Sequence, residues 1–134
     1  MCFHYILSDS PDDDPRYLFN VAYGVGKAGC DRMAADCAHE LREAGVAMIS
    51  LWPGPVKTEF IVEKMNDGDP MFKVFEKGES IEYSGKVVVH LAAETAETMM
   101  ARSGRIINTA DVARQYNFKD IDGTVPANFR QVTH

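Results

Sequence analysis

Tyr23 and Lys27 are the two residues of this sequence whose types and spacing most directly suggest chemistry. On a helix, side chains four residues apart project from one face, so both could contact the same small molecule. A phenol in water has a pKa of about 10, but an adjacent ammonium favours the phenolate and lowers that pKa. Tyr23 could then act as a general acid or base. Two residues are a weak pattern, and an exposed aromatic beside a solvated lysine is the alternative.

Two further groups follow segments that we expect to be strands. Ser10 comes after the apolar residues 3–7, at the carboxyl end where parallel sheets place their ligands, and Ser8 is a second hydroxyl in the same loop. The other segment ends at Pro53-Gly54-Pro55-Val56-Lys57-Thr58. There a glycine permits close approach, and exposed backbone groups can form hydrogen bonds with a flat amide.

The pattern of apolar residues predicts the elements that position these groups. Apolar residues recur at intervals of three and four from Tyr23 to Ala44, which predicts a long helix that begins about a turn earlier and stops at Gly45. A continuous apolar run from Val46 to Trp52 then predicts a strand. A helix followed at once by a strand that is apolar on both faces favours a parallel sheet covered on both sides.

The rest of the chain predicts shorter elements, which together make half of an α/β domain. We expect short helices over 59–65 and 71–77, a helix over 85–93 with Ser84 as its N-cap, a strand over 105–108, and a short helix from Asp111.

These residues, taken in order, resemble the short-chain dehydrogenase/reductase (SDR) family. The resemblance covers the chain from about Tyr17 to about Gly123 and implies an α/β fold that is the C-terminal half of a Rossmann-type doubly wound parallel sheet. Residues 1–134 would then be one partial domain that lacks the N-terminal glycine-rich, cofactor-binding half of the family. The resemblance rests on Ser10, Tyr23-Gly-Val-Gly-Lys27, Glu40-Leu41-Arg42-Glu-Ala-Gly45-Val46, Pro53-Gly54-Pro55-Val56-Lys57-Thr58, Ser84-Gly85-Lys86-Val87-Val88-Val89, Ser103-Gly104-Arg105-Ile106 and Asp111-Val112-Ala113-Arg114-Gln115-Tyr116.

The resemblance implies an NAD(P)-dependent oxidoreductase that transfers hydride between a nicotinamide and a small carbonyl compound or secondary alcohol. Tyr23 would exchange a proton with the substrate oxygen, and Ser10 would orient that oxygen. Lys27 would bind the nicotinamide ribose and lower the pKa of Tyr23. The carboxamide of NADP or NAD would be held by Pro53, Gly54, Val56 and Thr58.

The resemblance also raises the alternative of an inactive, truncated product that associates with full-length SDR protomers. The resemblance implies a homo-oligomer formed through the helix from Tyr23 to Ala44 in the full-length form. A cytoplasmic location or association with the endoplasmic reticulum, and hence with a membrane, both stay open.

The composition excludes several other classes of protein. The chain has 134 residues, a formal net charge of −6 and 46% hydrophobic residues, which is typical of one ordinary globular domain. An acidic chain without a Lys/Arg run predicts no nucleic-acid partner. Four scattered histidines predict no metal site, and three cysteines without CxxC spacing predict unpaired thiols in a reducing compartment. We expect neither an export signal nor a transmembrane segment.

Overall fold

Two short parallel strands lie at the centre of the described part of the chain. The computed structural model describes residues 21–68 and 70–126. The elements in chain order are α1 (Val21–Glu40), β1 (Ser50–Trp52), α2 (Glu59–Asn66), the 3-10 helix η1 (Pro70–Lys77), α3 (Ile81–Ala92), α4 (Ala96–Arg102), β2 (Ile106–Asn108) and α5 (Thr109–Tyr116). The strand expected at residues 3–7, together with Ser8 and Ser10, lies outside the described residues.

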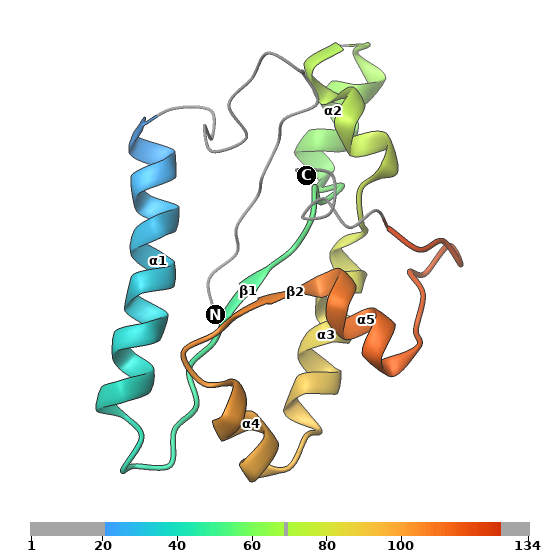
Figure 1. Cartoon of the computed structure of the whole chain (residues 1–134). Helices are drawn as coiled ribbons and strands as arrows, with labels where there is room; N and C mark the ends of the chain where they lie inside the picture. Colours follow the sequence, from blue (N-terminus) through green and yellow to red (C-terminus); the bar gives the residue numbers. More distant parts are fainter. Residues whose placement is uncertain (1–20, 69, 127–134) are drawn as a thin grey trace, which may run out of the picture.

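The strands form the middle of three layers. β1 pairs in parallel with β2, with Leu51 opposite Ile107, and Figure 1 shows α1 on one side of the strands with α3 and α5 on the other. Because successive side chains of a strand face opposite ways, Leu51 joins the core on the α3 side while its neighbours face α1. That core consists of Ile49, Leu51, Val87, Leu91, Ile107 and Val112. The predicted α/β class with a sheet covered on both sides is confirmed, and the arrangement is compatible with a partial Rossmann fold.

The first helix ends at Glu40, four residues before the predicted end at Ala44, and residues 41–45 form a turn that closes at Gly45. Gly45 has a φ of +69°, which glycine adopts without the steric cost that other residues incur. Its N–H donates to the carbonyl of Arg42 at 3.1 Å, and the N–H of Val46 donates to the carbonyl of Leu41 at 3.3 Å. These two bonds form a Schellman motif, which satisfies carbonyls at the helix end and turns the chain toward β1.

The expected strand from Val46 to Trp52 is too long. Only Ser50–Trp52 enters the ladder, because β2 begins at Ile106 and the residues before it form a turn. That turn binds Met48 directly: the N–H of Gly104 donates to the Met48 carbonyl at 2.7 Å, and the Met48 N–H donates to Ser103 Oγ at 3.0 Å. The apolar run therefore continues as bonded but irregular backbone.

The predicted role of Ser84 is wrong. The helix begins at Ile81, and its N-cap is Ser80, whose Oγ accepts from the N–H of Tyr83 at 3.1 Å. Ser84 lies one turn inside α3, is buried, and donates from Oγ to a carboxylate oxygen of Glu79 at 2.8 Å. Two serines four residues apart both suit a helix start; their contacts distinguish them, because Ser80 is bonded to Asp120 and Ser84 to Glu79.

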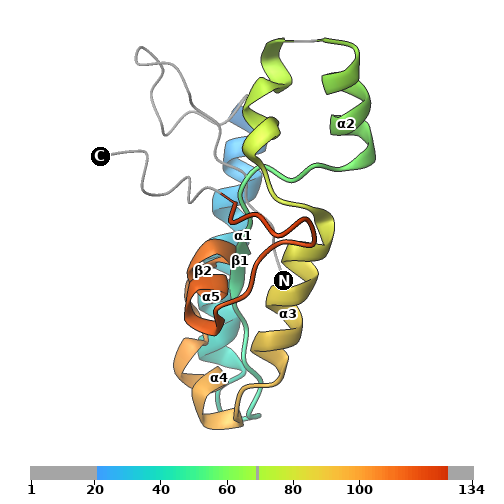
Figure 2. The same ribbon diagram turned by 90° about the vertical axis from the view of Figure 1, so that its right-hand side faces the viewer.

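The remaining helices agree with the prediction in part. The helix expected at 59–65 is α2, and the segment expected at 71–77 is the 3-10 helix η1. Figure 2 shows this pair at one end of the molecule. The last helix begins at Thr109 rather than at Asp111, with Asn108 as its N-cap. Helix α4, capped by Thr95, was not predicted.

Candidate functional site

Tyr23 and Lys27 are in contact on α1. The Lys27 Nζ lies 5.4 Å from the centroid of the Tyr23 ring, within the distance at which an ammonium is attracted to an aromatic face. Both residues are half-buried. Helix α1 thus holds a positive charge beside the phenol, as the spacing predicts.

Asp31 connects this helix to the sheet. Its Oδ1 accepts from Ser50 Oγ at 2.5 Å and from Trp52 Nε1 at 2.9 Å. These two donors are the first and last residues of β1, so one carboxylate oxygen joins α1 to the whole strand. The sequence analysis missed Asp31, although its position four residues after Lys27 extends the same helical stripe.

The contact at Asp31 sets where Tyr23 and Lys27 lie. Figure 1 shows α1 running antiparallel to β1, so residues before Asp31 lie toward the carboxyl end of the strand. With a rise of 1.5 Å per residue, Lys27 lies about 6 Å and Tyr23 about 12 Å beyond Asp31 along the helix axis. Gly54, two residues after the strand, lies about 7 Å beyond Trp52. The helical pair and the loop that begins at Pro53 are therefore at the same end of the sheet.

The backbone of this loop is held on one side by Glu79. The Glu79 N–H donates to the Pro55 carbonyl and the Lys57 N–H donates to the Glu79 carbonyl, both at 2.8 Å. In a parallel bridge of this kind, the residue between the two bonded groups, here Val56, turns its own N–H away from the bridging residue. The Val56 N–H is therefore not used by Glu79.

Thr58 ends the loop and begins α2. Its Oγ1 accepts from the N–H of Ile61 at 3.4 Å, which uses a lone pair and leaves the hydroxyl proton to donate elsewhere. Pro53 and Pro55 are buried, whereas Gly54 is half-exposed. The residues present therefore fit a nicotinamide carboxamide, with one backbone N–H, one hydroxyl and a glycine that permits close approach.

Glu79 is a second residue that the sequence analysis missed. Its side chain is 2% exposed, and its two carboxylate oxygens accept from Ser84 Oγ and Thr109 Oγ1, each at 2.8 Å. Burial raises the pKa of the Glu79 carboxyl to about 7, although the bonds from Thr109, Ser84 and the Gly54 N–H oppose the shift. No spacing in the sequence marks this residue, because its partners come from three separate elements.

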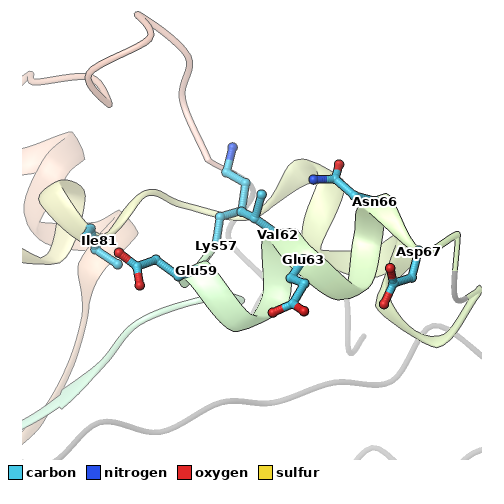
Figure 3. Close-up of a pocket in the computed structure, with 7 residues that line it drawn as sticks. All are labelled: Lys57, Glu59, Val62, Glu63, Asn66, Asp67 and Ile81. Atoms are coloured by element: carbon cyan, nitrogen blue, oxygen red, sulfur yellow. The ribbon is translucent and has the colours of Figure 1, made fainter.

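A depression beside α2 is not part of this arrangement. It has a volume of about 450 Å³ and is lined by Lys57, Glu59, Val62, Glu63, Asn66, Asp67 and Ile81. Figure 3 shows its charged side chains diverging, with Lys57 and Glu63 pointing to opposite sides of α2. Of the loop from Pro53 to Thr58 it includes only Lys57, so it does not adjoin the side of the loop that Val56 and Thr58 offer.

The described residues form neither a metal-binding cluster nor a membrane-spanning helix. No group of three or more His, Cys, Asp or Glu residues there is arranged to hold a metal ion. None of the helices in 21–68 and 70–126 combines the length and the apolar character that crossing a membrane requires.

Sequence comparison identifies the class of protein to which this arrangement belongs. No family model matches the chain, but two curated proteins do, and through them the chain belongs to the SDR family. It is 52% identical over 116 residues to "Dehydrogenase/reductase SDR family member 1" of Mus musculus, and 48% identical over the same length to the Homo sapiens protein of that name. Each alignment covers 81% of this chain and 36% of the relative. The chain thus spans about a third of the length of these relatives.

Proposed function

We propose that this chain supplies the proton-transferring and nicotinamide-binding part of an NAD(P)-dependent oxidoreductase. Its substrate would be a small carbonyl compound or the corresponding secondary alcohol. The observation that carries the proposal is the alignment of two features at one end of the sheet. These are the Tyr23–Lys27 pair, held by Asp31, and the loop from Pro53 to Thr58. Membership of the SDR family supports the same reaction class.

The proton chemistry is assigned to Tyr23. In reduction the phenol donates its proton to the substrate oxygen as that oxygen gains negative charge, and in oxidation the phenolate accepts a proton from the alcohol. Lys27, whose ammonium lies against the Tyr23 ring, favours the phenolate by its charge. Lys27 also offers donors to the ribose hydroxyls of the cofactor. Ser10, which lies outside the described residues, would orient the reacting oxygen.

The loop after β1 would hold the cofactor. The bound NAD or NADP supplies the hydride acceptor or donor in the form of its nicotinamide ring. The N–H of Val56 and the hydroxyl of Thr58 would form hydrogen bonds with the carboxamide, and Pro53 and Gly54 would pack beside it. A carboxamide fixed at two points holds the ring in one orientation, which is the contribution of positioning to the rate.

The proposal is tested with a chimera, since this chain spans about a third of its relatives' length. The portion of the mouse relative that precedes the matched segment is placed ahead of the chain. NADH and NADPH binding is then measured by calorimetry, and turnover by cofactor oxidation with small apolar ketones. We expect the chimera to bind one of the two cofactors, and Tyr23→Phe to lower turnover about 100-fold or more with binding retained.

The chain offers a matched control for that substitution. Among the described residues, Tyr83 is a buried tyrosine whose hydroxyl has no hydrogen-bond partner, and it lies on α3, in the layer across the sheet from α1. Tyr83→Phe removes the same atom and should leave turnover unchanged. Equal loss in both variants, or none in Tyr23→Phe, would refute the role of Tyr23. Failure of the chimera to bind either cofactor would refute the proposed function.

We further propose that α1 mediates self-association, as the resemblance implies. Val21 and Val25 are 75% and 66% exposed, and they lie one turn apart on one face of the helix. Val25→Lys should shift the sedimentation of the chain toward the monomer, whereas the exposed Val89→Lys on α3 should not. An unchanged distribution in Val25→Lys would contradict this arrangement.

A further inference from the structure

Glu79 is bonded to the loop through its backbone. This backbone forms the bridge to Pro55 and Lys57, at 2.8 Å on each side. Gly78 makes this approach possible, because a Cβ placed there would lie 2.3 Å from the Pro55 carbonyl oxygen. The Glu79 backbone is therefore held against the loop on both sides of Val56.

The carboxylate joins two separate elements. Thr109 Oγ1, at the start of α5, donates to Oε2, and Ser84 Oγ, inside α3, donates to Oε1. Thr109 directly follows β2, and the Glu79 backbone is bonded to the loop after β1. The ends of both strands are thus attached to one buried residue.

The consequence for the loop is conformational. Glycine has more backbone freedom than any other residue, and Gly54 is flanked by prolines, which have no N–H to form a hydrogen bond. The bridge that begins at the Pro55 carbonyl is therefore the contact that holds this segment. Any rotation at Gly54 would move Val56 relative to Tyr23.

We infer that the Glu79 side chain is a positioning residue for the nicotinamide, because its bonds to α3 and α5 fix the backbone bridge that holds the loop presenting Val56 and Thr58. The inference rests on the proposed function. Glu79 itself is buried behind the loop, touches neither substrate nor cofactor, and carries out no step of the reaction. Its contribution is to hold the amide-binding groups at a constant distance from Tyr23.

The test uses Glu79→Gln, with Glu82→Gln as the matched control. Glutamine keeps the shape of the side chain but replaces one acceptor oxygen with an NH₂ donor, so at least one of the two hydroxyls can no longer donate to it. Glu82 is exposed on the first turn of α3. In the 134-residue chain, amide hydrogen exchange over Gly54 to Thr58 should become about tenfold faster in Glu79→Gln, as expected for the loss of one hydrogen bond to a charged group. Exchange at Leu51 and Val87 should stay as in the parent.

The chimera supplies the functional readout. Glu79→Gln should raise the KM for the cofactor about tenfold. The pH profile of kcat, which reports proton transfer by Tyr23, should not change. If Glu79→Gln fails to fold, Ser84→Ala, which removes one donor and keeps the carboxylate, should show smaller changes in the same direction.

The outcomes separate the two proposals. A folded Glu79→Gln variant with parental loop exchange or parental cofactor KM overturns the role of Glu79 while the proposed function stands. A folded Ser84→Ala variant that matches the parent in both measurements does the same if Glu79→Gln cannot be purified. A parent chimera that binds no cofactor refutes the proposed function, and the nicotinamide role of Glu79 with it.

Discussion

Burial of Glu79 should make the stability of this protein depend on pH in a way that one substitution removes. The carboxyl is 2% exposed, and burial raises its pKa from 4.5 to about 7. A group whose pKa is higher in the folded than in the unfolded state binds its proton more tightly when folded. The free energy of unfolding therefore falls as the pH rises from about 4.5 to about 7, and the loss is complete above that range.

The size of the effect follows from the two pKa values. A rise from 4.5 to about 7 is a roughly 300-fold change in acid dissociation, which at 1.36 kcal/mol per tenfold change amounts to about 3 kcal/mol. The acidic group that adds to the shift is Asp120, itself buried, and the neighbouring Tyr83 has its own pKa raised to about 12, chiefly by burial. Tyr83 is neutral throughout this range, so Glu79 is the group expected to titrate near pH 7.

The assay compares two proteins across pH. Urea unfolding of the parent chain and of Glu79→Gln is measured at intervals from pH 4.5 to pH 8, and the difference in unfolding free energy is plotted against pH. Because both proteins share every other titrating group, the difference isolates Glu79. We expect the parent to lose about 3 kcal/mol relative to the variant over this range. A flat difference for Glu79→Gln would refute the assignment of a buried carboxyl with a raised pKa.

Three further substitutions test other parts of the fold. Gly78→Ala should destabilise the chain by about 1–3 kcal/mol, because its methyl would meet a backbone carbonyl at 2.3 Å. Gly85→Ala, with open space inside α3, should stabilise the chain by roughly 0.5–1 kcal/mol. Thermal unfolding of the two variants measures both effects. Ser80→Ala removes the N-cap of α3 and a hydrogen bond to Asp120, so a loss of about 1–2 kcal/mol is expected in the same experiment, and a loss below 0.5 kcal/mol would contradict this role. Asp31→Ala should speed amide exchange throughout α1 and leave α3 unchanged, since its carboxylate joins α1 to β1; protected α1 amides in this variant would show that other contacts dock the helix.

Local patterns were sufficient to predict the elements whose signals lie within a few residues. The helix at α2 follows from side-chain periodicity, and the turn at Gly45 follows from the glycine itself, although the helix before it ends at Glu40. The class of the fold also followed, because a strand that is apolar on both faces needs cover on both sides. The choice between Ser80 and Ser84 did not follow, because both have the same local preference and only their contacts, Ser80 with Asp120 and Ser84 with Glu79, separate them.

The candidate site divides in the same way. Tyr23 and Lys27 are adjacent because a helix brings residues four apart together, so their contact was predictable. Asp31 was missed because its partners lie about twenty residues further along the chain. Glu79 was missed because its partners come from α3, from the start of α5 and from the loop after β1. Residues whose partners are distant in the sequence form no local spacing pattern, so the sequence alone does not identify them.

The hydrogen bond between Asp31 and Trp52 gives this protein a built-in optical reporter. Trp52 is the single tryptophan of the chain, and its indole N–H donates to the carboxylate that holds α1 against β1. Indole emission shifts with the polarity of the surroundings, so separation of α1 from the strand would change the fluorescence of this one residue. The same event would carry Tyr23 away from the loop that begins at Pro53. The emission wavelength of Trp52 can therefore report, without any label, whether the proposed proton donor Tyr23 lies beside the loop.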